Sequence, residues 1–163
     1  MGTLRTALKV QFDCKHVASA DYNTSFEATM PGIPDFVWSD GTTANKADQL
    51  YADTGVTLAT ATTRNLDLRA LTTPLGVSQQ FVEVRLIMIR CRDYALTFAK
   101  GASDGWTGLG SAWTMTFPAG TWICLSNPTD GAMVTSASNK VIDITNASGS
   151  TATYDVIVVG TTA

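Results

Sequence analysis

Residues 81–93, with the sequence FVEVRLIMIRCRD, form the stretch that most constrains the fold. This stretch lacks glycine and proline, and its Val and Ile content favours a β-strand over a helix. Apolar and charged residues alternate at its start, whereas Ile87, Met88 and Ile89 are apolar on both faces. A strand centre of this kind needs cover on both sides. We expect one face to pack inside a two-sheet core, and the other to be covered by residues 18–53 or by a sister subunit, which we favour.

The rest of the chain repeats short strand patterns separated by turns. A length of 163 residues fits one domain, and frequent Thr with few Glu and Lys favours strands over helices. Short connections and the lack of alternating strand and helix patterns predict an all-β, antiparallel β-sandwich with jelly-roll topology over residues 1–163. We expect a first strand over residues 3–17, a long irregular excursion around residues 18–55, and at most one short helix, at residues 44–52.

The shortest connections predict which strands are neighbours. Only a corner at Arg92 and Asp93 separates the opening stretch from a strand at residues 94–100, so the two should form a hairpin or one bulged strand. Residues 112–117 and 121–125 flank the turn 118–120 in the same way. The closing strand at residues 151–159 should pair with its predecessor at residues 140–145.

Charge and hydropathy exclude some partners. The net charge of −3, with 15% charged residues, argues against binding of nucleic acid, which needs a concentrated basic face. No apolar run approaches the length of a membrane span, and the first residues lack the pattern of a secretion signal, so we expect no membrane and synthesis in the cytoplasm. Cys14, Cys91 and Cys124 are odd in number and widely spaced, which favours buried free thiols over disulfides.

No pattern in the chain predicts a catalytic, cofactor-binding or metal-binding residue. His16 is the single histidine, and Cys14 with His16 lacks the second ligand pair of a zinc site. The chain has no Gly-x-Ser-x-Gly elbow, no calcium loop and no phosphate-binding glycine motif. An enzyme would have to use His16 or a pair of carboxylates. We therefore expect a protein without enzymatic activity and without a cofactor.

Two features indicate binding. Trp106 lies in the glycine-rich stretch 101–110, which we expect to be a mobile loop, where an exposed indole could stack on a sugar as in carbohydrate-binding modules. Arg85, Arg90 and Arg92, with Arg69, could form a basic patch that faces a partner. The alternative is a set of solvated or Asp-paired arginines on the surface.

Three motifs in order resemble a family of small structural proteins encoded in the head-gene regions of tailed bacteriophages. They are Trp38-x-Asp-Gly-x-x-Ala-Asn-Lys46; Leu66-Asp-Leu-x-x-Leu71, leading to Gly76 and to Phe81-x-x-Val-x-x-Ile-x-Ile89; and an ending from Pro118-Ala-Gly120 through Val141-Ile-x-Ile-x-Asn146 to Tyr154-Asp-Val-Ile-Val-Val-Gly160. The resemblance covers most of the chain from Trp38 onward. Each motif is common alone, and their order and spacing carry the likeness.

The resemblance implies a capsid decoration or cement protein. Such a protein binds the outside of the capsid in the virion and bridges major capsid protein subunits, usually as a homo-oligomer, for which we favour a homotrimer. The alternatives are a tail, fibre or adaptor component of the virion and a carbohydrate-binding β-sandwich module. The residues that we expect at the partner interface are Trp38, Asp40, Asn45, Lys46, Arg69, Arg85, Ile87, Arg90, Arg92 and Trp106.

Overall fold

A computed structural model describes residues 6–8, 13–17, 25–29, 36–127, 131 and 133–163, with side chains from Trp38 onward. The described residues form strands and turns without a helix, which confirms the all-β prediction. Residues 44–52, which we expected to tolerate a helix, form a turn and the start of a strand instead. Asn45 in that turn has a φ of 59°, a left-handed conformation that would end a helix there.

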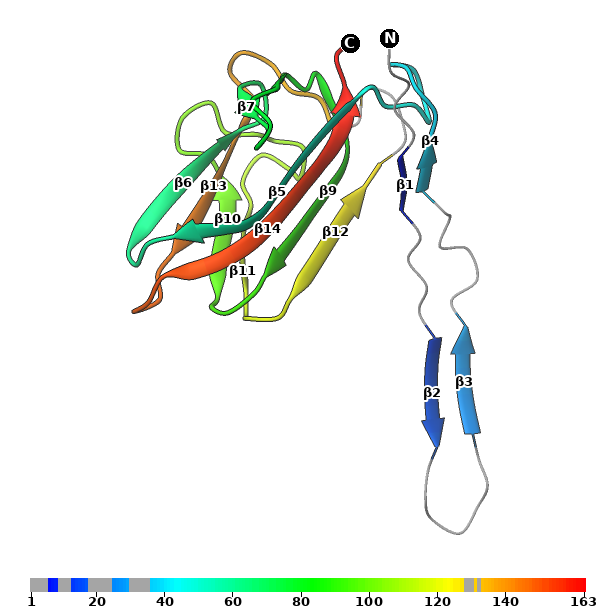
Figure 1. Cartoon of the computed structure of the whole chain (residues 1–163), viewed down its shortest axis with the longest axis vertical. Helices are drawn as coiled ribbons and strands as arrows, with labels where there is room; N and C mark the ends of the chain where they lie inside the picture. The colour runs from blue at the N-terminus through cyan, green and yellow to red at the C-terminus, as the bar shows by residue number, and fades with distance from the viewer. Residues whose placement is uncertain (1–5, 9–12, 18–24, 30–35, 128–130, 132) are drawn as a thin grey trace.

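Eight strands form the sandwich, in two antiparallel sheets of four (Figure 1). The first sheet has the order β12-β9-β14-β5 and the second the order β11-β10-β13-β6. Lettered B to I along the chain, the eight strands give the orders B-I-D-G and C-H-E-F, which is the jelly-roll topology. Their bounds are β5 (Gln49–Leu58), β6 (Thr62–Asp67), β9 (Glu83–Cys91), β10 (Leu96–Lys100), β11 (Thr114–Phe117), β12 (Trp122–Ser126), β13 (Val141–Asn146) and β14 (Ala152–Thr161).

The core lies between the two sheets, and strand alternation selects the residues that fill it. From the first sheet, Ile87 and Ile89 of β9 and Val156 and Val158 of β14 point inward. They meet a layer of apolar side chains from the second sheet, centred on Phe98. Successive residues of a strand point to opposite faces, so the residues between these inward positions form the outer face.

Sequence neighbours are not sheet neighbours at three connections where we expected them to be. β9 and β10, β11 and β12, and β13 and β14 each lie in opposite sheets. The short connections cross from one sheet to the other instead of closing hairpins. Packed sheets lie only about 10 Å apart, so a connection of a few residues spans that gap as easily as it reverses a hairpin. Strand β9 pairs instead with β12 and β14.

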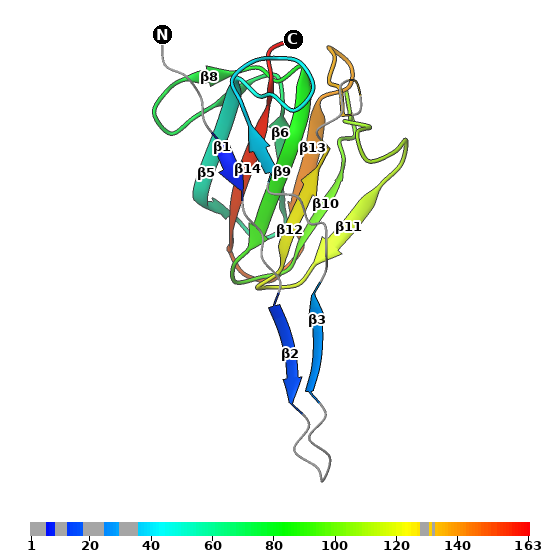
Figure 2. The same ribbon diagram turned by 90° about the vertical axis from the view of Figure 1, so that its right-hand side faces the viewer.

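The N-terminal part of the chain forms two short antiparallel ribbons. β1 (Thr6–Leu8) pairs with β4 (Phe36–Trp38), and β2 (Asp13–Val17) pairs with β3 (Ser25–Thr29). The described parts of the expected first strand, residues 3–17, are β1 and β2, and the excursion around residues 18–55 holds β3, β4 and part of β5. In both views the β2–β3 ribbon extends beyond one end of the sandwich (Figures 1 and 2).

A small hairpin projects from the connection between β6 and β9. It consists of β7 (Leu71–Thr72) and β8 (Ser78–Gln79). At its tip Leu75 is 91% exposed, whereas Leu71 at its base is buried. The hairpin is thus anchored through its base and presents an apolar tip.

Candidate functional site

The outer face of the first sheet is divided into a covered half and an open half. Residues in register across β12, β9 and β14 form three outward rows: Ser126, Leu86 and Val159; Cys124, Met88 and Ile157; and Trp122, Arg90 and Asp155. The first row lies beneath the chain that returns from β4. The last row lies at the end of the sheet where β12 begins. One end of this face is therefore covered by the chain itself, and the other end is open to solvent.

Trp38 and Ala47 cover the first half. They are 2% and 1% exposed and pack with Leu86 and Val159 in a second apolar cluster, separate from the core. The loop between them is held at its base by a hydrogen bond from the Ala47 amide to the Ser39 carbonyl at 3.0 Å. Part of the cover that the apolar centre of β9 requires thus comes from this chain and not from a second subunit.

Loop 39–46 is exposed above this anchored base. Asp40, Asn45 and Lys46 all face solvent, whereas Trp38 directly before the loop is buried. Within the loop the Lys46 amide donates to the Thr43 carbonyl at 3.0 Å. A polar loop held at both ends by buried residues is a suitable contact surface, because its position is fixed before a partner binds.

The open half contains a depression of about 130 Å³. We call its lining residues the Trp122 patch: Thr54, Met88, Arg90, Trp122, Asp155 and Ile157. Trp122 is 58% exposed, and the Arg90 guanidinium carbon lies 4.8 Å from the centroid of its ring. Met88 and Ile157 are partly buried against the covered half. The patch thus joins an exposed indole and a cation to an apolar floor.

The charges of the patch are unequally satisfied. Asp155 accepts from Arg92 Nε at 2.9 Å and from the Gly55 amide at 2.8 Å. The Arg92 hydrogen bond lowers the pKa of Asp155 below its ordinary value, against the opposing effect of desolvation. The buried Nε of Arg90, by contrast, has no hydrogen-bond partner among the described residues. The Arg90 guanidinium instead stacks on the Trp122 ring and has no salt-bridge partner among the described residues.

Four of the predicted interface residues are buried and cannot contact a partner directly: Trp38, Arg85, Ile87 and Trp106. Arg85, expected on a basic surface, is 1% exposed and pairs through Nη2 with Glu83 Oε2 at 2.7 Å. It is the extra residue at a register shift between β9 and β14, which interrupts the strand alternation, and its guanidinium reaches the Thr42 carbonyl at 3.4 Å. Ile87 is 3% exposed and belongs to the core, so Met88 is the outward residue of this pair.

Trp106 was expected in an exposed mobile loop and is instead fully buried at 0% exposure. Its Nε1 donates to the Val134 carbonyl at 3.2 Å, and its own carbonyl accepts from Trp113 Nε1 at 2.9 Å. Gly108 lies against the ring so closely that a Cβ there would sit 2.1 Å from an indole carbon. Gly108 therefore permits the close packing around Trp106, which is not placed to stack on a sugar.

The structure brings Arg90 and Arg92 together and leaves Arg69 apart. Arg90 and Arg92 both lie at the Trp122 end of β9, whereas Arg69 follows β6 of the second sheet. Sequence reasoning did not select Trp122, the exposed tryptophan of the described chain. The signal that could have found it is its register opposite Arg90, which needs the β12–β9 pairing and not the sequence pattern of β12 alone.

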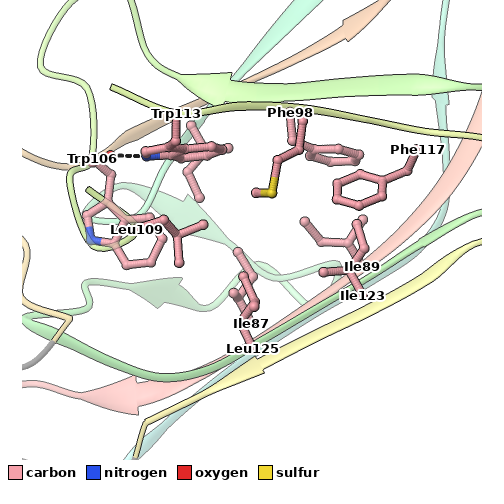
Figure 3. Close-up of a pocket in the computed structure, with 11 residues that line it drawn as sticks. Ile87, Ile89, Phe98, Trp106, Leu109, Trp113, Phe117, Ile123 and Leu125 are labelled. Atoms are coloured by element: carbon pink, nitrogen blue, oxygen red, sulfur yellow. Dashed lines mark hydrogen bonds between the residues drawn. The ribbon is translucent and has the colours of Figure 1, made fainter. Parts of the chain in front are cut away.

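An apolar crevice between the sheets does not provide a second site. It opens between the edge strands β11 and β12, and its lining includes Phe98, Trp113, Phe117 and Ile123 (Figure 3). Its volume is about 20 Å³. A space lined by apolar side chains offers no hydrogen-bond partners to water, so it stays dry and belongs to the packing of the core.

A polar cluster lies between the sheets where β5, β6 and β14 meet. Tyr51 donates its hydroxyl to Asp53 at 3.0 Å, and Arg64 donates to the Tyr154 hydroxyl at 3.0 Å. Burial raises the pKa of both tyrosines, so both phenols stay protonated at neutral pH. The cluster links the two sheets through hydrogen bonds.

Among the described residues, no group of three or more His, Cys, Asp and Glu side chains is arranged to hold a metal ion. Cys14 and His16 lie in β2, whose side chains are outside the described part. Cys91 and Cys124 are free thiols, the first buried and the second exposed, so the expectation of burial holds for one of them. The described strands and turns include no helix that could cross a membrane. Comparisons with protein-family models, curated proteins and solved structures found no match to this chain.

Proposed function

We propose that this chain is a non-enzymatic structural protein of a bacteriophage particle. In this role it decorates the outer surface of the capsid and bridges major capsid protein subunits. Its place in a virion rests on the resemblance of the three ordered motifs, and the jelly-roll architecture is one that viral capsid domains use. Because a fold alone does not select a function, the proposal depends on surfaces that fit assembly.

The anchored loop 39–46 is the observation that carries the proposal. Trp38 and Ala47 are buried against β9 and β14, and they hold Asp40, Asn45 and Lys46 in a fixed, solvent-facing loop. A surface preorganised in this way loses little conformational entropy on binding, which favours recognition of a large, rigid partner. We assign capsid contact to this loop. The chain would work as an oligomer, with a trimer preferred, made in the host cytoplasm and bound to the finished capsid.

Binding to capsids that lack this chain tests the proposal directly. Purified protein is mixed with such particles and sedimented, and the bound copies are located by cryo-electron microscopy. We expect ordered density on the capsid exterior and loss of binding in Lys46→Glu. A matched control is Thr114→Glu, an exposed position on the outer edge strand of the second sheet. Density confined to the tail would support the tail or adaptor alternative, and failure to bind any particle would refute a virion role.

A further inference from the structure

We infer that the β2–β3 ribbon of one copy docks on the Trp122 patch of a second copy. This inference rests on the proposed function as an assembly protein, and it names the partner for a surface other than the capsid-binding loop. It predicts that the bridge between capsid positions contains contacts between copies of this chain.

The ribbon lacks a sheet of its own. Within the described residues, β2 and β3 pair with each other and with no further strand. An isolated two-stranded hairpin is at best marginally stable in water, because it has no second layer against which to bury side chains. Both views show this ribbon extending away from its own sandwich (Figures 1 and 2). Its stability therefore calls for a surface supplied by another molecule.

The Trp122 patch is a surface without a cover in the described chain. Trp, Arg and Met are the residue types enriched at the energetic centres of protein interfaces, and this patch combines Trp122, Arg90 and Met88. The same face is already covered at its other half by Trp38. A segment that packed on the patch would cover the half of this outer face that Trp38 and its neighbours leave open.

Charge and position favour a ribbon from a second copy as that segment. In sequence, the ribbon from Asp13 to Thr29 carries three acidic residues against one lysine. The patch offers Arg90, a cation without a salt-bridge partner among the described residues, whereas its carboxylate is already paired with Arg92. The patch lies on the row where β12 begins, so a neighbouring ribbon can approach it without crossing the loop that covers Leu86.

The size of the contact predicts a closed assembly. Strands of five residues span about 17 Å. One contact of that length buries less than the roughly 1,000 Å² of a stable interface. Several such contacts must therefore form together, either reciprocally in a dimer or around a ring.

Sedimentation equilibrium of the full chain tests the interface. We expect wild-type protein to self-associate, and Trp122→Ala and Met88→Asp to weaken that association about tenfold or more. Thr114→Asp, on the exposed outer face of the other sheet, should associate like wild type. Circular dichroism and thermal unfolding show whether each variant is folded. A monomeric wild type, or unchanged association of folded Trp122→Ala, would overturn the inference.

A charge-exchange experiment identifies the ribbon as the occupant. Arg90→Glu places an acid in the patch, and the double variant Asp13→Lys with Glu27→Lys reverses the net charge of the ribbon. Each variant alone should be monomeric. Mixed together they should form hetero-oligomers, because each ribbon then meets a patch of opposite charge. Absence of association in the mixture refutes docking between copies, since folding back within one chain cannot be rescued by mixing.

Capsid binding separates this inference from the proposed function. Monomeric wild type that still decorates capsids would refute the exchange of ribbons and leave the decoration role standing. Wild type that oligomerises through the Trp122 patch but binds no capsid would refute the decoration role and leave the exchange standing.

Discussion

The buried pair of Arg85 and Glu83 gives a stability prediction that distinguishes the structure from the surface patch expected from the sequence. The two side chains are 1% and 13% exposed, and their charged atoms are 2.7 Å apart. Arg85 also donates to the Thr42 carbonyl at 3.4 Å, so it links β9 to the loop 39–46. Glu83 in turn accepts from the Gly131 amide at 2.7 Å.

Replacing Arg85 by Met should destabilise the fold strongly. Removal of one partner leaves the Glu83 charge buried, which costs about 3–5 kcal/mol. For a domain of this size, where 1 kcal/mol corresponds to about 2–4 °C, the Tm should fall by roughly 6–20 °C. The double variant Glu83→Gln with Arg85→Met removes both charges. The double variant should regain most of the lost free energy of unfolding, because a buried ion pair stabilises a fold little or no more than uncharged residues in the same place.

Urea unfolding of wild type, both single variants and the double variant forms the thermodynamic cycle. We expect a coupling free energy above about 2 kcal/mol between the two sites, beyond the about 1 kcal/mol of an exposed pair. A loss below about 1 kcal/mol in Arg85→Met would mean that the guanidinium is solvated. The reasoning from burial would then fail, and the sequence-based expectation of a surface arginine would be correct.

Three further predictions concern the core and the open half of the outer face. Trp106→Ala should cost about 3–5 kcal/mol in urea unfolding, because a fully buried side chain is lost; a folded variant of wild-type stability that loses only glycan binding would contradict this. Ile87→Asp should leave the chain unfolded by circular dichroism, because the core would have to hold a carboxylate, and a folded monomer would contradict the inward orientation. Arg92 lowers the pKa of Asp155, so the stabilisation by this ion pair is complete above the ordinary Asp pKa and is lost as the pH falls through the lowered pKa. Asp155→Asn should therefore lower the Tm at pH 7 and have little effect on it near pH 2. An equal change of Tm at both pH values would refute the ion pair.

The sequence predicted the strands better than their partners. Period-two alternation and β-branched residues are local properties, so β10, β13 and β14 lie close to where the pattern placed them. Which sheet a strand joins depends on the direction of the chain at each corner. The sequence of a connection such as residues 92–95 is the same kind of sequence whether it closes a hairpin or crosses between the sheets, because both connections need polar turn residues. The jelly-roll order was therefore predictable as a fold class, while the three expected hairpins were wrong.

The choice between the tryptophans shows a second limit of local reasoning. Glycine around Trp106 predicted an exposed loop, because glycine marks flexible turns. The structure uses Gly108 for the opposite reason, since only a residue without Cβ lets the backbone approach the indole ring. Trp122, in a regular strand, is exposed because it points outward from an edge strand at the open end of its sheet. Exposure followed from strand position and orientation, which the composition of the neighbouring residues does not encode.

The two-sided apolar centre of β9 follows from the same non-local geometry. Leu86 and Met88 both point outward and lie two positions apart on the same face of β9, yet Leu86 is buried and Met88 is only partly buried. Leu86 belongs to the cluster that includes Trp38, almost fifty positions earlier in the chain, whereas Met88 is only partly buried against that cluster. An apolar side chain outside that cover exposes apolar surface to water, which is unfavourable unless another surface packs against it. The proposed assembly role would account for an open patch next to a closed one, and for the apolar residues that β9 carries beyond those in its own core.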